Sequence, residues 1–143
     1  MRISTKGRYA LEALLYMALL PEGQSASTRS IAEATDISDG YLEQLFIPLR
    51  KAGIIRGIRG PMGGYTPGRD PRDIRAGDIL RTLEGSMELV ECVNSIDCPK
   101  AATCGGKHTW SELYQEIAGC VDSISLADIV DAYKAMDTPE YTI

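Results

Sequence analysis

Four side chains able to bind a soft metal lie in one short stretch of this sequence. Cys92, Cys98 and Cys104 are spaced six residues apart, and His108, the only histidine of the chain, follows them. Thiolate sulfur and imidazole nitrogen are ligands that iron–sulfur clusters and zinc ions take in proteins. The stretch holds few large apolar residues, so we predict a metal-binding loop between two helical regions.

The even spacing of the cysteines favours an iron–sulfur cluster over a zinc ion. Structural zinc sites usually contain cysteine pairs about two to four residues apart, which close around a single ion. A cluster is wider than one ion and tolerates longer gaps. Free thiols are a third interpretation, but unliganded cysteines are more often buried as small apolar residues than spread along a polar loop. For His108 two interpretations stay open, a fourth ligand or a cap of the helix that follows.

A cysteine beside a histidine can also act as a nucleophile with its base. Cys104 and His108 are close enough in sequence to be considered for this role. No carboxylate pattern that would orient the histidine accompanies them, and no glycine-rich substrate loop does. We therefore predict that the protein is not an enzyme.

The charge of the chain is distributed unevenly. The 143 residues carry a net charge of −5. Residues 1–60 contain eight lysines and arginines against six acidic residues, whereas residues 61–143 contain seven against fourteen. DNA binding needs a locally positive face and not a positive total, so the N-terminal part is the candidate for it.

The sequence predicts neither a membrane span nor a secretory leader. No apolar run approaches the ~20 residues of a membrane helix, and Tyr9 and Glu12 interrupt the first apolar stretch. We expect a cytoplasmic protein without a membrane partner. In a reducing cytosol, the four cysteines favour metal or redox roles over disulfides.

The spacing of apolar residues predicts a mainly α fold. Helices are expected over residues 7–20, 30–35, 39–51, 76–84, 109–122 and 125–136. The helix over 39–51 is expected to be capped by Ser38 or Asp39, to bury Leu42, Leu45, Phe46 and Leu49, and to expose Tyr41, Glu43, Gln44 and Arg50. The last helix is expected to begin with a capping box in Ser125-Leu-Ala-Asp128. Strand-like runs over 54–58 and 64–66 flank a segment rich in glycine and proline, which predicts a tight hairpin. Two short helices joined by a tight turn and followed by a hairpin form a winged helix-turn-helix. The predicted parts are this DNA-binding domain with its small β-hairpin wing (1–85), a cysteine-rich cluster-binding loop (86–108), and a dimerisation helix with a C-terminal helix (109–143).

The helix predicted over 109–122 has an apolar seam that we expect to form a homodimer. Apolar residues recur three and four apart along it, which is the spacing of a short heptad pattern. Such a seam is too apolar to face water. Cys120 lies on it, so we assign this cysteine to packing and not to metal binding. The seam residues are Trp110, Leu113, Ile117, Cys120 and Ile124.

Ten residues are candidates for contacts with double-stranded operator DNA. Glutamine can pair with adenine and glutamate can accept from cytosine, each pairing contributing ~1–3 kcal/mol of discrimination. Arginine beside flexible glycines suits a narrow minor groove, and basic residues near the first helix suit phosphates. The candidates are Arg2, Lys6 and Arg8 near the first helix; Ser38, Tyr41, Glu43, Gln44 and Arg50 on the second helix of the pair; and Arg59 and Gly60 in the wing.

Three segments resemble a family of winged-helix regulators that includes IscR, NsrR and CymR. They are residues 1–10, residues 41–45 together with 49–53, and the wing motif Ile58-Arg-Gly-Pro-Met-Gly-Gly-Tyr65, and the resemblance extends over nearly the whole chain. IscR-type members are homodimers that hold an iron–sulfur cluster on three cysteines six residues apart. The resemblance therefore implies one [2Fe-2S] cluster on Cys92, Cys98 and Cys104, and control of genes for cluster assembly or related stress responses.

The match with that family has two departures. IscR-type members place a ligating histidine three residues after the last cysteine, where this chain has Lys107, and His108 comes one residue later. NsrR-type nitric-oxide sensors use a carboxylate near the N-terminus, where this chain has Arg8. The segments 76–85 and 141–143 resemble CymR-type regulators of cysteine metabolism, which lack the cysteine loop. The prediction is a cluster-sensing regulator, with a CymR-like, zinc-binding or nitric-oxide-sensing regulator as alternatives.

Overall fold

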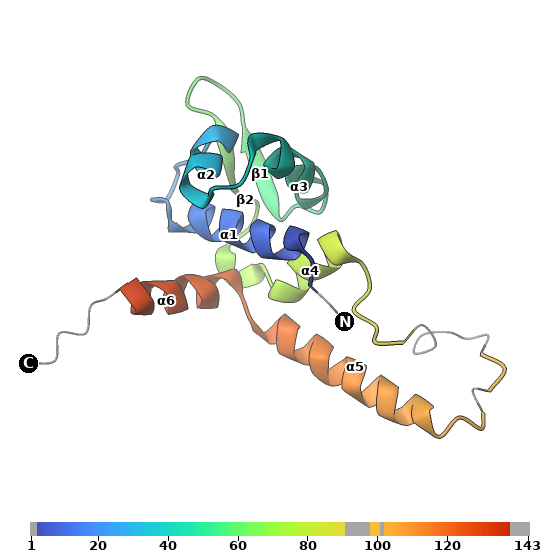
Figure 1. The fold of residues 1–143 in the computed structure, drawn as a ribbon. Coiled ribbons are helices and arrows are strands. Elements are labelled where there is room, and N and C mark those ends of the chain that lie inside the picture. The colour runs from blue at the N-terminus through green and yellow to red at the C-terminus, as the bar shows by residue number, and fades with distance from the viewer. Residues whose placement is uncertain (1–2, 91–97, 101, 138–143) are drawn as a thin grey trace, which may run out of the picture.

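The computed structural model describes residues 3–90, 98–100 and 102–137. Helices α1 (Thr5–Leu19), α2 (Thr28–Thr35) and α3 (Asp39–Lys51) precede a hairpin of β1 (Ile55–Ile58) and β2 (Gly64–Pro67). The short 3-10 helix η1 (Pro71–Asp73) and α4 (Ala76–Glu84) follow, and α5 (Gly106–Ser123) and α6 (Leu126–Asp137) complete the described chain. As Figure 1 shows, the hairpin stands at one end of the molecule and α5 extends away from the other. This is the mainly α, winged helix-turn-helix architecture that the sequence predicts.

The first three helices begin where serine side chains satisfy free backbone N–H groups. Ser4 accepts a hydrogen bond from the Lys6 N–H, and Ser27 accepts one from the Ser30 N–H. Ser38 caps α3 in the same way by accepting from the Tyr41 N–H at 3.3 Å. Local sequence thus determines where these helices start, within two residues of the predicted positions.

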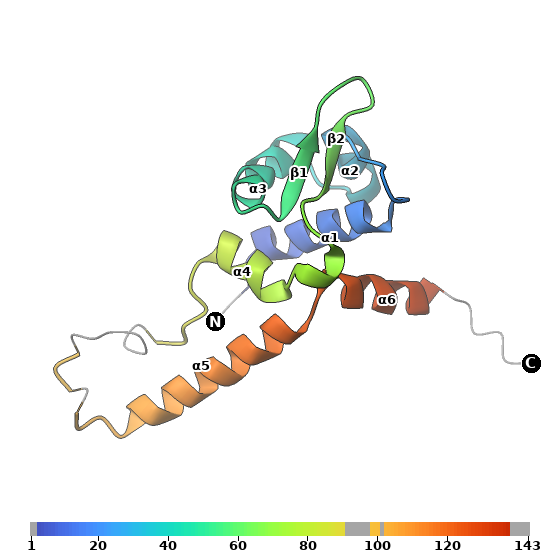
Figure 2. The same cartoon turned by 180° about the vertical axis from the view of Figure 1, so that it is seen from behind.

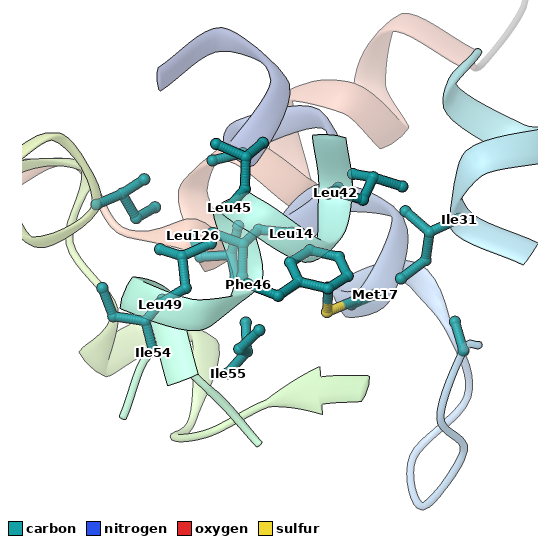
Figure 3. Close-up of a cluster of buried hydrophobic side chains, with 14 of the residues drawn as sticks. Leu14, Met17, Ile31, Leu42, Leu45, Phe46, Leu49, Ile54, Ile55 and Leu126 are labelled. Carbon is teal, nitrogen blue, oxygen red and sulfur yellow. The ribbon is translucent and has the colours of Figure 1, made fainter. Parts of the chain in front are cut away.

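The core of the N-terminal domain lies between α1, α3 and the hairpin. In α3, Leu42, Leu45, Phe46 and Leu49 recur at helical spacing and are buried, as predicted. Figure 3 shows the Phe46 ring beside Met17 of α1, and its centroid lies 4.8 Å from that of Tyr65 in β2. Burial of such side chains is the main favourable term in folding. This burial fixes the orientation of α3, so the face opposite the buried side chains points toward solvent.

The hairpin packs against the segment that joins α1 to α2. The Ala26 N–H donates to the Tyr65 carbonyl at 3.0 Å, and the Tyr65 N–H donates to the Ala26 carbonyl at 2.7 Å. A Cβ at Gly64 would collide with the carbonyl oxygen of Ala26. Glycine at position 64 therefore allows this close backbone contact, which positions the wing relative to the helices.

Helix α4 links the N-terminal domain to the long helix α5. The Glu84 carboxylate accepts hydrogen bonds from Ser4 N and Gly7 N, both at 3.0 Å, and from the Ser4 hydroxyl at 2.6 Å. These bonds hold the pKa of Glu84 below its ordinary value. Three residues earlier on α4, Arg81 donates two hydrogen bonds to Asp122 of α5, at 2.7 and 2.9 Å.

Helix α6 completes the core from the C-terminal side. It begins with the predicted capping box, in which Ser125 N donates to Asp128 and Asp128 N donates to Ser125, at 2.9 and 3.0 Å. Leu126 is fully buried in the same cluster as the α1 and α3 side chains. From behind, Figure 2 shows α6 below α1 and pointing away from α5. None of the described helices combines the length and apolar content that crossing a bilayer requires.

The structure corrects one prediction about α5. The helix begins at Gly106, three residues earlier than predicted, so His108 lies in its first turn and not at the end of a loop. The last residue of the predicted seam, Ile124, is the C-cap residue of α5. Helix α5 has no buried residue, and the seam cysteine Cys120 is exposed. Its apolar side chains are therefore uncovered in a single chain.

Candidate functional site

The outward face of α3 carries a stripe of three side chains, Glu43, Ile47 and Arg50. They are four and three residues apart, which places them on one side of a helix, and all three are exposed. Glu43 and Arg50 were predicted to be exposed here. Ile47 was not among the predicted contacts, although its spacing from both would have placed it on this stripe. Its side chain is 62% exposed.

Gln44 lies next to this stripe, on the side of α3 that faces Lys6 of α1 and the end of α4. Together with Tyr41 they line a small pocket of about 150 Å³. Gln44 is exposed as predicted, but Tyr41 is half-buried. The Tyr41 ring packs edge-on against Tyr9 at 5.6 Å, and the Arg8 guanidinium lies 5.9 Å from the Tyr9 ring. The prediction of a fully exposed Tyr41 is therefore wrong, because this ring contacts α1.

The predicted wing residues lie at the free end of the hairpin. Arg59 and Gly60 are exposed, and Gly60 has a φ of 115°, a conformation that favours glycine. A groove of about 410 Å³ lies between the hairpin and the end of α3, and Arg50 and Arg59 are among its lining residues. The stripe of α3 and the wing therefore border one continuous surface.

This surface is positively charged where it meets the groove. Within the described residues neither Arg50 nor Arg59 takes part in an ion pair. Unpaired guanidinium groups can bind phosphate oxygens with two hydrogen bonds each. Of the remaining predicted contacts, Ser38 caps α3 through its hydroxyl oxygen, and Arg2 lies outside the described residues.

The described part of the cysteine segment lies directly before α5. Cys98 is half-buried and Cys104 is exposed, and both are free thiols. The Cys104 N–H donates to the Lys100 carbonyl at 2.8 Å, and the Cys104 carbonyl accepts from the Lys107 N–H at 3.3 Å. Cys92 lies outside the described residues. Within the described residues, no three potential ligands are gathered around one point.

His108 lies in the first turn of α5, four residues after Cys104, which immediately precedes the N-cap residue Gly105. Its side chain is 90% exposed, and its Nε2 atom lies 3.8 Å from a carboxylate oxygen of Glu112. A histidine that binds a metal usually turns its second ring nitrogen toward a carboxylate, carbonyl or water. Glu112 lies one turn further along α5 and near this ring, although 3.8 Å exceeds hydrogen-bonding distance.

The start of α5 has the chemistry to hold an anionic centre. No side chain caps it, so N–H groups of its first turn are available to negative charge. A Cβ at Gly106 would lie 3.2 Å from the indole nitrogen of Trp110 and 3.9 Å from the Cys104 sulfur. The indole is therefore close to the thiol. The donor set of this segment fits an iron–sulfur cluster in type.

The chain is similar to known transcriptional regulators along most of its length. The family model Rrf2, described as an iron-dependent transcriptional regulator, matches residues 3–132. The chain is 37% identical over 130 residues to the HTH-type transcriptional regulator IscR of Photobacterium profundum, covering 91% of this chain and 76% of that protein. It is 34% identical over 137 residues to IscR of Escherichia coli O1:K1 / APEC, covering 96% and 85%.

Two solved structures are similar in both fold and sequence. That of T. potens IscR has a TM-score of 0.78 and 36% identity, over 98% of this chain and 93% of that one. That of CymR, the global cysteine regulator of B. subtilis, has a TM-score of 0.76 and 38% identity, over 92% and 98%. Relatives named IscR and CymR thus share the fold.

Proposed function

Because this chain belongs to the Rrf2 family of iron-dependent transcriptional regulators, we propose that it binds operator DNA as a homodimer and senses an iron–sulfur cluster. The observation that carries the proposal is the position of Cys104 and His108, four residues apart at an uncapped helix start. Cys92 and Cys98 would complete the ligand set. Regulation of transcription takes place at the DNA, so we expect the protein in the cytoplasm.

In this proposal one [2Fe-2S] cluster per protomer is held by the three cysteines and His108. When bound, it supplies a one-electron redox centre whose potential depends on hydrogen bonding and solvent exposure. The first-turn N–H groups of α5 stabilise negative charge at this position. Glu112 would accept a hydrogen bond from the second ring nitrogen of a metal-bound His108.

Helix α5 would mediate dimerisation through its uncovered apolar side chains. Trp110, Leu113 and Ile124 are 39%, 42% and 39% exposed in the single chain. Burying such side chains against a symmetry-related copy is favourable by roughly 25 cal/mol per Å² of apolar surface. Two N-terminal domains would then face two half-sites of a pseudo-palindromic operator.

The DNA contacts follow from the surface around α3 and the wing. Glu43 and Gln44 would determine base preference in the major groove, whereas Arg59 would contact the minor groove and add affinity. Lys6, Arg8 and Arg2 would bind phosphates at the flank. A shared metal centre would link Cys92 and Cys98 to the first turn of α5, so cluster binding could change how the two domains are spaced. The coupling expected between cluster and operator is ~1–3 kcal/mol.

Anaerobic purification followed by an absorbance spectrum and iron and sulfide analysis tests the cluster. We expect a red-brown protein, and expect Cys98→Ala and Cys104→Ala to bleach it. Cys120→Ala is the matched control, because this exposed cysteine lies on α5 away from the proposed site. Full iron and sulfide in a variant lacking Cys92, Cys98 and Cys104 would refute cluster binding at this position.

A CymR-like regulator of cysteine metabolism is the second candidate function. It is favoured by the 38% identity to the B. subtilis cysteine regulator. The same purification separates the candidates, because a CymR-like or zinc-binding regulator would be colourless. Operator affinity measured with and without the cluster then tests sensing itself, and equal affinities on every operator would refute it.

A further inference from the structure

The one apolar side chain of the outward stripe on α3 has no role in the proposed contacts. Ile47 is 62% exposed, whereas its helix neighbours Phe46 and Leu49 are buried in the core. It lies between Glu43 and Arg50 on the stripe. It therefore faces the same way as Glu43, which is proposed to contact bases, and as Arg50, whose guanidinium can bind phosphate. An isoleucine in this position would occupy the space next to the base edges in a major groove.

The base edges of the major groove include one apolar group, the 5-methyl of thymine. We propose that Ile47 is a specificity-determining residue that packs against a thymine 5-methyl group in each half-site. The inference rests on the proposed DNA binding and adds a base preference that Glu43 and Gln44 do not supply. Glutamate accepts hydrogen bonds, and glutamine both donates and accepts them. Neither therefore distinguishes thymine from uracil, which differ only in the 5-methyl group, whereas an aliphatic side chain does.

The surroundings of Ile47 favour a nucleic acid over a protein partner. Arg50 and Arg59 border the adjoining groove without ion pairs to described residues. The exposed apolar residues here are Ile47 on α3 and Ile58 and Met62 in the wing. They come from two elements that border a groove lined by arginines, whereas a docking surface for a protein usually has one contiguous apolar centre. DNA can satisfy such a surface, because phosphates and the minor groove bind the guanidinium groups while a base edge contacts the isoleucine.

Helix geometry predicts where the thymine lies. Residues 43 and 47 are separated by about 6 Å along the helix axis, from a rise of about 1.5 Å per residue. Base pairs follow one another at about 3.4 Å. The thymine should therefore lie within about two base pairs of the base that Glu43 contacts.

The test combines a change in the protein with a change in the DNA. Operators are first selected from random duplex DNA with the anaerobically purified wild-type protein. Each thymine is then replaced singly by deoxyuridine, which removes only the methyl group. One replacement per half-site should weaken wild-type binding about fourfold, the effect of losing one methyl-sized burial. Ile47→Ala should bind the thymine and deoxyuridine operators equally.

Met136→Ala is the control variant, because Met136 is an 84% exposed apolar residue on α6 and should keep the wild-type response to deoxyuridine. Alanine is the best helix former, and the deoxyuridine arm uses unchanged protein, so the test does not depend on the variant's stability. An Ile47→Ala protein that responds to every deoxyuridine as the wild type does would overturn the inference. Selected operators without a thymine in the predicted window would also overturn it. So would an Ile47→Ala protein that loses its dimer mass but keeps its operator affinity, because Ile47 would then contact a second protomer and not DNA. If the wild type selects no operator, the proposed DNA binding fails instead.

Discussion

The ion pair between Arg81 and Asp122 should determine how firmly α5 is attached to the N-terminal domain. The guanidinium donates to both carboxylate oxygens of Asp122, at 2.7 and 2.9 Å, and the pair joins α4 to the last turn of α5. The hydrogen bonds from Arg81 lower the pKa of Asp122. A Cβ at Gly77 would collide with the Asp122 carboxylate, so glycine at this position leaves room for the pair.

The expected magnitude follows from the exposure of the two side chains, which is 36% for Arg81 and 43% for Asp122. Exposed ion pairs contribute roughly 0.2–1 kcal/mol, and a two-point geometry places this pair near the upper end. A loss of about 1 kcal/mol lowers the melting temperature of a chain of this size by roughly 3 °C. Because stability of a dimer depends on concentration, all variants must be compared at one protomer concentration.

A double-mutant cycle of Arg81→Met, Asp122→Asn and the combined variant measures the coupling directly. We expect a coupling of about 0.5–1 kcal/mol in unfolding free energy. Gly77→Ala should behave like Asp122→Asn and add little to it, because both remove the same contact. Arg29→Met together with Glu33→Gln is the control cycle, since that pair on α2 is 82% and 70% exposed. A coupling no larger than the control value would show that the pair does not hold the two helices together.

Further outcomes are expected for four variants. Glu84→Gln should destabilise the fold by about 1 kcal/mol at pH 7. The hydrogen bonds lower the pKa of Glu84 in the folded protein. Its contribution to stability is therefore present above the unfolded-state pKa of 4.5 and is lost as pH falls through the folded-state pKa. If chemical denaturation gave the same difference in unfolding free energy between wild type and Glu84→Gln at pH 4 and pH 7, this reasoning would be wrong. Gly64→Ala should separate the hairpin from Ala26 and weaken operator binding as well as stability, and a variant that melts at the wild-type temperature would contradict the close contact. Arg59→Ala should weaken binding to all operators and lower the slope of log affinity against log salt concentration by about one. Gln44→Ala should instead relax the base preference at one position per half-site. Both effects are measured by titrating operator DNA at several salt concentrations.

Much of the N-terminal domain could be predicted from sequence because its signals are local. Serine caps at the helix starts and apolar residues at helical spacing are properties of neighbouring residues, and Ser38 and the buried face of α3 appear where they were expected. The glycines and proline of the wing likewise predict a hairpin from within their own segment. Cys98, Cys104 and His108 indicate a metal site by their residue types alone, without knowledge of the fold.

The tertiary structure alone decided which side chains face outward and which distant residues meet. Tyr41 has helical spacing compatible with exposure, but packing of α3 on α1 places its ring against Tyr9. Glu84 accepts hydrogen bonds from the start of α1, about 80 residues earlier in the chain, and local patterns contain no information about such a partner. The need for glycine at positions 64 and 77 also arises only when two distant segments approach each other. The spacing of apolar residues indicates which face of a single helix or strand is apolar. These contacts depend instead on which elements pack together and how closely they approach.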